Sequence, residues 1–298
     1  MANERKKVSI VLPVYNGANH IANSINSIIN QTYRNWELII VNDCSTDKTL
    51  QICNEYTHND NRIKLFSNEK NLKLPNSLNI GFEVATGDYY TWTSDDNMYK
   101  PNAIETLVHA MEQYPDAVMV YADYTSIDAD GEILYEVKLQ EPQYIVTGNV
   151  FGACFLYTAE IAKRVGKYDA NLFLAEDYDY WMRIYRFGRI IHITDNLYLY
   201  RHHECSLSET KKDLIQEQTY KALEKNFLPL YVDAKKNQLD YSFFDQMLER
   251  GHEHLEETKA LLIEFDSGYR RYLKRITFKE TIYNTIWFKL LRRMKSFL

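Results

Sequence analysis

The first hundred residues alternate between short apolar runs and segments with helical periodicity, and this alternation constrains the fold more than any other feature. Residues 8–14 (VSIVLPV) form a nearly continuous apolar run that ends at Asn16-Gly17, which is typical of a strand buried on both faces. Three more strands are expected at 37–41, 63–66 and 89–93, with helices beginning near Ile21, at 47–57 and near 75–85. Repeated strand-helix units predict an α/β fold with a mainly parallel sheet.

The later residues predict a smaller set of strands followed by helices only. A hairpin turn is expected at Asp128-Ala-Asp-Gly131, helices at 158–165 and 178–187, and strands at 189–193 and 197–201. Beyond residue 208 the apolar spacing is helical over 209–226, 241–264 and 268–297, with a loop near Pro229. We therefore expect an α/β domain over residues 1–208 and a helical C-terminal extension over residues 209–298.

Acidic residues follow two of the expected strands. Asp43 and Asp47 come after the second strand, and the adjacent pair Asp95 and Asp96 comes after the fourth. In parallel sheets ligands bind at the carboxyl ends of the strands, and neighbouring carboxylates repel each other unless a cation lies between them. Mg²⁺ and Mn²⁺ often use one or two carboxylates together with substrate phosphates. An ordinary solvated turn is the alternative interpretation of the pair.

The charge is distributed unevenly along the chain. The net charge of −6 combines 35 Lys and Arg with 41 Asp and Glu, which argues against a general nucleic-acid binder. Residues 267–298 contain nine basic residues and one acidic residue, a net charge of +8, so residues 1–266 carry −14. The segment also has an apolar helical stripe. It is therefore expected either to lie on an anionic membrane surface or to pack on the acidic body or a second protomer.

The cysteines and the N-terminus indicate a cytoplasmic protein. Cys44, Cys53, Cys154 and Cys205 show no spacing typical of a zinc site or a disulfide framework, which favours a reducing compartment. The apolar run after the basic N-terminus is too short for a signal peptide. No stretch approaches the roughly 18–20 apolar residues of a spanning helix.

Four ordered motifs resemble the family 2 glycosyltransferases of GT-A fold. They are VSIVLPVYNG at 8–17, WELIIVNDCSTD at 36–47, GDYYTWTSDD at 87–96, and Glu176-Asp177 followed by Trp181 and Arg183. The resemblance covers about residues 6–205, and residues 94–101 are most similar to the SpsA-type branch. It implies a Rossmann-like, mainly parallel central sheet and a nucleotide-sugar donor.

The resemblance also assigns nucleotide-binding positions. Pro13 and Tyr15 match residues that line the base pocket, although a tyrosine there is alternatively a core-edge residue. Asp43 matches the acid that accepts a hydrogen bond from the uracil N–H, and an N-cap role with Asp47 is its alternative. Asp95 matches the residue that contacts the ribose. Lys73 falls near a loop that meets the base or diphosphate in relatives, and its alternative is a solvated lysine.

The resemblance also implies a divalent cation, Mn²⁺ or Mg²⁺, beside Asp96. Asp96 matches the last residue of the family's Asp-x-Asp motif, whose first position here is Ser94. This departure puts tight intrinsic metal binding in doubt and suggests an ion held largely by the nucleotide diphosphate. His203, in Tyr200-Arg-His-His203, matches a late histidine that approaches the metal or the diphosphate. A structural histidine is the alternative.

Asp177 matches the family's catalytic base, and a carboxylate can take a proton from an attacking hydroxyl. With one base and no identifiable nucleophile, direct attack predicts inversion at the anomeric carbon. The alternative is that Glu176 and Asp177 only place negative charge at a helix N-terminus.

Together these features predict an inverting, metal-dependent transfer of a hexose or N-acetylhexosamine from a nucleotide-sugar, most simply a UDP-sugar, to a surface-glycan or lipid-linked acceptor. The enzyme would be cytoplasmic, with a peripheral membrane position open. A catalytically silent nucleotide-binding scaffold of the same fold is the alternative. No G-x-G-x-x-G follows the first strand, which argues against a dinucleotide-linked dehydrogenase.

Overall fold

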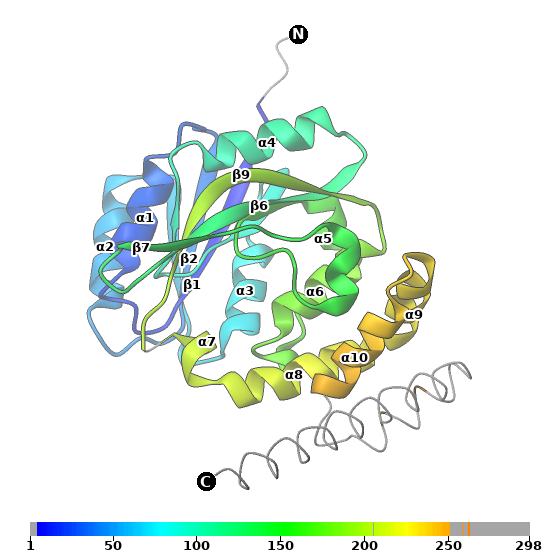
Figure 1. The fold of residues 1–298 in the computed structure, drawn as a ribbon. Helices are drawn as coiled ribbons and strands as arrows, with labels where there is room; N and C mark the ends of the chain where they lie inside the picture. The colour runs from blue at the N-terminus through cyan, green and yellow to red at the C-terminus, as the bar shows by residue number, and fades with distance from the viewer. Residues whose placement is uncertain (1–4, 205, 251–257, 259–261, 263–298) are drawn as a thin grey trace, which may run out of the picture. The chain divides into compact units, whose positions relative to one another are not determined.

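The computed structural model describes residues 5–204, 206–250, 258 and 262. Contacts between residues divide the chain into two compact units, Met1–Leu239 and Asp240–Leu298, and each is described by itself. Most of the elements described below belong to the first unit, in which helices cover both faces of a central sheet (Figure 1).

The first half of this unit follows the expected alternation closely. Its elements are β1 (Val8–Val14), α1 (Ile21–Ile29), β2 (Trp36–Asn42), α2 (Thr49–Asn59), β3 (Ile63–Ser67), α3 (Leu74–Glu83), β4 (Tyr89–Trp92), β5 (Met98–Tyr99) and α4 (Ala103–Gln113). Every residue of β1 and β2 is buried, as a strand covered on both faces requires.

The second half contains longer strands and then helices. Its elements are β6 (Ala117–Ile127), β7 (Ile133–Val137), the 3₁₀ helix η1 (Pro142–Thr147), β8 (Phe155–Thr158), α5 (Ala159–Val165), the 3₁₀ helix η2 (Ala170–Leu172), α6 (Glu176–Tyr185), β9 (Arg189–Arg201), α7 (Leu207–Thr210), α8 (Lys212–Lys225) and α9 (Phe227–Lys236). The β6–β7 hairpin turns at the expected Asp128–Gly131 segment, where Oδ1 of Asp128 accepts hydrogen bonds from the next main-chain N–H groups.

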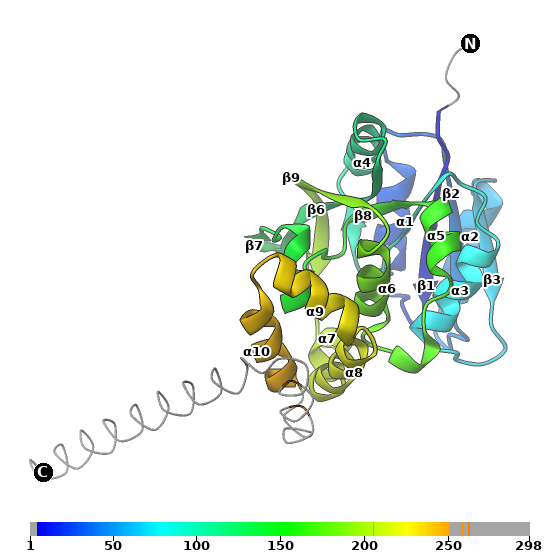
Figure 2. The ribbon, with the colours of Figure 1, turned by 90° about the vertical axis from the view of Figure 1, so that its right-hand side faces the viewer.

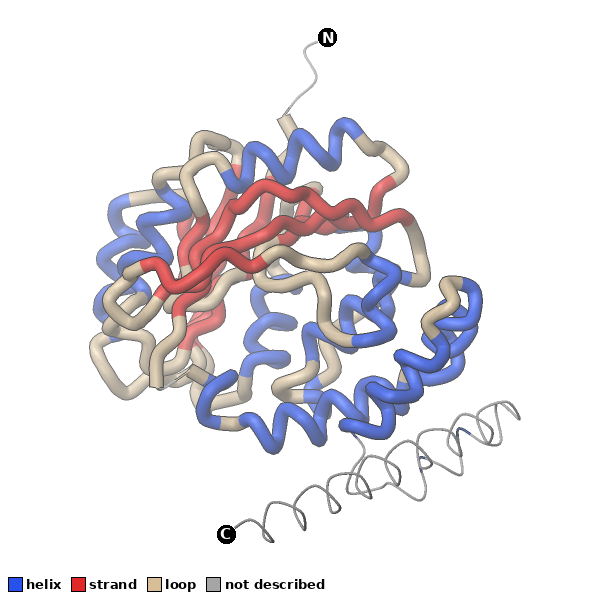
Figure 3. Tube along the Cα trace, in the orientation of Figure 1, coloured by secondary structure: helices blue, strands red, loops and turns tan. Residues whose placement is uncertain are grey.

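The strands form a nine-stranded sheet in the order β3-β2-β1-β4-β8-β6-β9-β5, with β7 paired to β6 (Figure 3). The pairs among β1, β2, β3 and β4 are parallel, and so is β6–β9, whereas β8, β5 and β7 pair antiparallel. The predicted α/β fold is confirmed. The antiparallel strands β5 and β8 were not predicted, because they are only two and four residues long.

Apolar side chains pack between the sheet and the helices that Figure 2 shows beside it. On one face, Ile10 and Leu12 of β1 pack in a core that includes Ile25 of α1 and Leu107 of α4. On the other face, α3 comes so close that a Cβ added to Gly81 would lie 2.4 Å from Cγ1 of Val11. Trp181 of α6 lies against an aromatic cluster on that face, which contains Phe155, Tyr157, Tyr180 and Phe151.

One strand replaces the two expected at 189–193 and 197–201. β9 continues through the polar residues Thr194-Asp-Asn196 and absorbs the extra length as register shifts against β6. Oδ1 of Asn196 accepts hydrogen bonds from Lys100 and Thr125, so this polar side chain has hydrogen-bond partners within the sheet.

The helices after residue 206 differ from their expected boundaries. The expected helix 209–226 is divided at Lys211 into α7 and α8. The loop predicted near Pro229 is wrong, because Pro229 is the third residue of α9, within the first turn, where its missing N–H costs no helical hydrogen bond. In the second unit, α10 spans Asp240–Arg250, with Phe243, Phe244 and Met247 buried. The expected helix 268–297 and most of residues 251–264 lie outside the described residues.

Candidate functional site

A cavity of about 840 Å³ opens at the carboxyl ends of β1, β2 and β4. The parallel pairing brings Val14 beside Asn42 and Val11 beside Trp92, so the loops that follow these three strands meet at one edge of the sheet. The segment before α6, the first residues of α6 and the start of α7 also line it. All eight residues selected from the sequence line this cavity: Pro13, Tyr15, Asp43, Lys73, Asp95, Asp96, Asp177 and His203.

Asp43 holds the loop that precedes α3. Its carboxylate accepts hydrogen bonds from the main-chain N–H groups of Leu72 (2.7 Å) and Lys73 (2.9 Å) and from Nδ2 of Asn68 (2.8 Å). The alternative N-cap role for Asp43 is therefore not observed, and Asp47 instead accepts from Thr49 at the start of α2. Asp43 lines the cavity with capacity for one further hydrogen bond, since a carboxylate accepts about four.

Backbone strain is concentrated around this cavity. Lys73 has φ 71° and ψ 164°, a region that is populated almost only by glycine and costs about 1–3 kcal/mol. Asn16 and Leu174, which also line the cavity, and Cys44, next to Asp43, have positive φ as well. The hydrogen bond from Lys73 N to Asp43 shows how the fold stabilises one of these conformations.

Asp95 lies against the loop that leads into α1. Its Oδ2 is so close to Gly17 that a Cβ there would lie 1.9 Å away, so only glycine fits at position 17. Burial, together with the neighbouring charge of Asp96, raises the pKa of Asp95 to about 7. Two adjacent carboxylates therefore stand in this part of the cavity with little compensating charge.

Asp96 and His203 form a pair suited to a divalent cation. Nε2 of His203 lies 3.0 Å from Oδ2 of Asp96, while Oδ1 of Asp96 is buried and has no hydrogen-bond partner among the described residues. Nε of Arg201 donates to the main-chain oxygen of Asp96 and fixes the loop. A buried, unpaired carboxylate oxygen beside an imidazole fits Mn²⁺ or Mg²⁺. Among the described residues, no group of three or more His, Cys, Asp and Glu side chains could hold a metal ion.

Glu176 and Asp177 begin α6 at the opposite wall. Oδ1 of Asp177 accepts from Tyr178 N (2.7 Å) and Oδ2 from Nδ2 of Asn149 (2.9 Å), whereas Oε2 of Glu176 accepts from Leu174 N (2.6 Å). Burial and the charge of Asp177 raise the pKa of Glu176 to about 8, and burial also raises the pKa of Asp177. Because Asp177 has the extra donor, we assign the proton of this pair to Glu176 at neutral pH.

Several cavity residues were not selected from the sequence. Asn149 lies in the loop that follows η1. His20 precedes α1, and its ring centroid is 5.4 Å from that of His203. Phe173 lies beneath Nζ of Lys73 at 5.9 Å. None of them belongs to a recognisable motif. The sequence therefore contains no signal for them, and only the fold brings them to the cavity.

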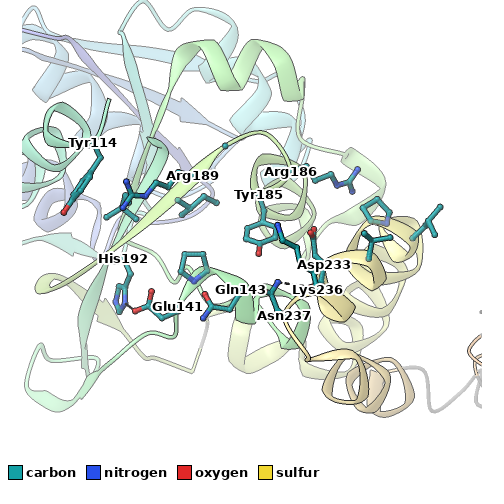
Figure 4. Close-up of a pocket in the computed structure, with 17 residues that line it drawn as sticks. Tyr114, Glu141, Gln143, Tyr185, Arg186, Arg189, His192, Asp233, Lys236 and Asn237 are labelled. Atoms are coloured by element: carbon teal, nitrogen blue, oxygen red, sulfur yellow. Dashed lines mark hydrogen bonds and ion pairs between the residues drawn. The ribbon is translucent and has the colours of Figure 1, made fainter. Parts of the chain in front are cut away.

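A second cavity, of about 1020 Å³, lies between β9, α9 and η1 (Figure 4). None of the predicted site residues lines it. His192 there lies 2.7 Å from Asp123 and 3.4 Å from Glu141, and Arg189 stacks on Tyr114. These side chains contact one another and no carboxylate with an unpaired buried oxygen is present among the residues that line this cavity. We therefore take the cavity of about 840 Å³ as the candidate functional site.

Within the described residues, no helix has the length and apolar character that crossing a bilayer requires.

Comparison with known proteins shows the family of this chain. Residues 9–166 match the model of the family described as Glycosyl transferase family 2. An uncharacterized glycosyltransferase of Rickettsia typhi is 33% identical over 233 residues, which cover 74% of this chain and 71% of the relative. Glycosyltransferase GlyG of Streptococcus pneumoniae is 30% identical and covers 70% of this chain and 74% of its own. The chain belongs to glycosyltransferase family 2.

Solved structures show the same fold at low sequence identity. Residues 1–349 of S. aureus TarS in complex with UDP-GlcNAc align with a TM-score of 0.67 and 16% identity, over 87% of this chain and 81% of that chain. A Pyrobaculum calidifontis mannosyltransferase in complex with GDP-Man and Mn²⁺ aligns with a TM-score of 0.58 and 16% identity, over 91% of this chain and 84% of that chain. The chain spans 43% of a longer TarS chain, so the likeness concerns its fold.

Proposed function

We propose that the cavity binds a nucleotide-sugar, most simply a UDP-sugar, and transfers its hexose or N-acetylhexosamine to an acceptor hydroxyl with inversion. The observation that carries this proposal is that one cavity holds both a carboxylate–imidazole pair and a pair of carboxyl groups. Asp96 with His203 suits a cation and a diphosphate, and Glu176 with Asp177 supplies a carboxylate that is free to accept a proton. The complexes of similar folds with UDP-GlcNAc and with GDP-Man and Mn²⁺ support the choice of donor.

The residues after β1 and β2 would hold the nucleotide. Tyr15 is 51% exposed and offers its ring as a face for the base, next to Pro13. The remaining acceptor capacity of Asp43 suits the N–H of a uracil ring. Asp95, held against Gly17, would contact the ribose, and Nζ of Lys73 would approach the diphosphate.

Asp96 and His203 would hold the cation. When bound, the ion would neutralise charge that develops on the departing diphosphate. The buried Oδ1 of Asp96 would gain the partner that it lacks among the described residues.

Asp177 would act as the general base. An acceptor hydroxyl would transfer its proton to the carboxylate as its oxygen forms a bond to the anomeric carbon, and the bond to the diphosphate would break. Attack opposite to the leaving group inverts the configuration. The Asn149 amide would keep Asp177 oriented and ionised for this step.

The test is a screen of UDP- and GDP-hexoses with Mn²⁺ or Mg²⁺, in which released nucleotide and sugar products are identified by mass. Turnover of at least one donor that requires Asp177 supports the proposal. The replacement of the first Asp of the family motif by Ser94 favours a silent scaffold as the alternative. Tight UDP binding without turnover of any donor would establish that alternative.

The acceptor side of the proposal includes a surface glycan or a lipid-linked sugar. The α/β domain would end near residue 208 and be followed by the helical extension. Within that extension, residues 267–298, with their net charge of +8, would bring the enzyme to an anionic membrane surface. Flotation with anionic liposomes tests the membrane role. Equal flotation of the full chain and of a chain ending at residue 266 would contradict it.

A further inference from the structure

Tyr200 presents a hydroxyl group to the cavity from the end of β9. Tyr198, two residues earlier, lines the cavity as well, because alternate residues of a strand lie on the same face. The hydroxyl of Tyr198 forms a hydrogen bond with Thr93. Among the described residues, the hydroxyl of Tyr200 has one partner, Oγ of Ser208 at 3.4 Å, whereas hydroxyl groups usually lie about 2.7–2.8 Å apart. The Tyr200 hydroxyl is therefore able to bind a ligand in the cavity.

Two serines of the segment that leads into α7 add hydroxyl groups at the same place. Oγ of Ser208 also lies 3.4 Å from Oγ of Ser206, and both serines line the cavity. Each hydroxyl group can donate one hydrogen bond and accept two, so contacts of this length leave much of their capacity unused. Groups that both donate and accept match the hydroxyl groups of a sugar.

The end of β9 is attached to the loop that carries Asp96. Nε of Arg201 donates to the main-chain oxygen of Asp96, and Nε2 of His203 lies 3.0 Å from Oδ2 of Asp96. Burial raises the pKa of Tyr200, and the charges of Asp96 and Asp177 raise it further. The Tyr200 hydroxyl therefore lies near the Asp96–His203 pair and near Asp177.

A direct displacement determines which part of the substrate occupies this position. The anomeric carbon must lie between the leaving oxygen and the attacking oxygen. In the proposed function, the leaving diphosphate lies at Asp96 and His203 and the attacking hydroxyl lies at Asp177. The transferred sugar therefore lies between these residues, and a side chain close to both of them contacts that sugar.

We propose that the Tyr200 hydroxyl, oriented by Ser208, forms a hydrogen bond with a hydroxyl group of the transferred sugar and so selects the sugar. This inference rests on the proposed function, because it takes a nucleotide-sugar as the occupant of the cavity. A site that hydrogen-bonds a substrate hydroxyl discriminates against an analogue without it, since the group on the protein is then left unpaired. Tyr200 is thus a specificity-determining residue, separate from the groups that hold the nucleotide.

The test compares binding of a nucleotide-sugar with binding of its free nucleoside diphosphate, by isothermal titration calorimetry with Mn²⁺. The full chain carries Asp177→Asn throughout, so that the nucleotide-sugar identified by the turnover screen is not consumed. Tyr200→Phe keeps the ring and should weaken binding of the nucleotide-sugar about three- to tenfold, while binding of the nucleoside diphosphate stays unchanged. Tyr135→Phe makes the same change at an exposed position outside the cavity lining and should alter neither affinity.

Monodeoxy analogues of the nucleotide-sugar identify the hydroxyl group that Tyr200 contacts. One analogue should bind at least about threefold more weakly than the complete nucleotide-sugar, and with Tyr200→Phe these two compounds should bind equally. A loss of binding through misfolding would not remove this discrimination selectively.

Two results would overturn the inference and leave the proposed function standing. One is an unchanged affinity for the nucleotide-sugar in Tyr200→Phe, with the same discrimination among the deoxy analogues. The other is an equal loss of affinity for the nucleotide-sugar and for the nucleoside diphosphate, which would place the effect in the nucleotide site. If no nucleotide-sugar is turned over by the wild type, the proposed function itself fails.

Discussion

The side-chain amide of Asn149 donates a 2.9 Å hydrogen bond to Oδ2 of Asp177, from a loop 28 residues earlier in the chain. An N–H donor stabilises a carboxylate more than a carboxylic acid, and a hydrogen bond to a charged group contributes about 1.5–3 kcal/mol. Together with the hydrogen bond from Tyr178 N, the Asn149 amide favours the charged form of Asp177.

Asn149→Ala should move the acidic limb of the pH–rate profile to higher pH by about one pKa unit or more, because Asp177 loses a donor that favours its charged form. The measurement is kcat/KM for donor turnover between pH 5 and pH 9. The loss of activity should be largest at acidic pH and should shrink as the pH rises. Asn171→Ala, at an exposed position, is the control. An unchanged limb in Asn149→Ala would show that this hydrogen bond does not tune the base.

Isosteric substitutions of Glu176 and Asp177 should lower turnover to different degrees. Glu176 has a pKa raised to about 8 by burial and by the charge of Asp177, so it carries the proton at neutral pH and Glu176→Gln should keep most of the turnover. Asp177→Asn removes the proposed general base and should lower turnover by about 10²–10⁴-fold. Both variants should unfold at similar denaturant concentrations. Equal losses of turnover would contradict the division of roles.

Lys73→Gly should stabilise the protein by about 1 kcal/mol. The native φ of 71° and ψ of 164° are strained for lysine and relaxed for glycine, and the gain exceeds the greater entropy that glycine has in the unfolded chain. Lys73→Ala keeps the strain and should leave the free energy of unfolding nearly unchanged. Both variants lose the lysine side chain. The difference between their free energies of unfolding, measured by urea denaturation, therefore gives the effect of backbone strain alone. Greater stability in the alanine variant would contradict the explanation.

Glu37 should stabilise the fold in a pH-dependent way. Burial by itself would raise its pKa, but hydrogen bonds from Ser9, Thr86, Lys64 and Lys7 outweigh burial and lower the pKa to about 2. Glu37→Gln should cost about 3 kcal/mol at pH 7. Because the folded-state pKa is depressed, this contribution is complete above about pH 4.5 and is lost as the pH falls toward 2.

Urea denaturation of the wild type and Glu37→Gln at pH 7 and at pH 3.5 checks this prediction. The difference in free energy of unfolding between the wild type and Glu37→Gln should be smaller at pH 3.5 than at pH 7. A constant difference would mean that the variant acts through packing and not through charge.

The α/β order of the fold was predictable because each early element carries its own local signal. The apolar run 8–14 and the isoleucines of α1 have the periods of a buried strand and an amphipathic helix. By contrast, β5 and β8 are too short to show a period, and the proline of α9 is compatible with both a loop and a first helical turn. Tertiary pairing decides such segments.

The candidate site could be predicted only where its residues follow strands in recognisable motifs. Asp43, Asp95 and Asp96 follow parallel strands, so one edge of the sheet gathers them. Asn149 and His20 reach the same cavity through a loop and a helix start whose sequences have no pattern of their own. Only the folded structure places them there, where Asn149 donates a hydrogen bond to Asp177 and the ring of His20 contacts that of His203.

The anomeric configuration of the first product tests the central claim most directly. With an α-linked UDP-sugar that the enzyme turns over, ¹H NMR at early times should show the β-configured sugar product, in transfer or in slow hydrolysis, and Asp177→Asn should form it far more slowly. The α-configured product appearing first, or full activity in Asp177→Asn, would contradict direct attack assisted by Asp177.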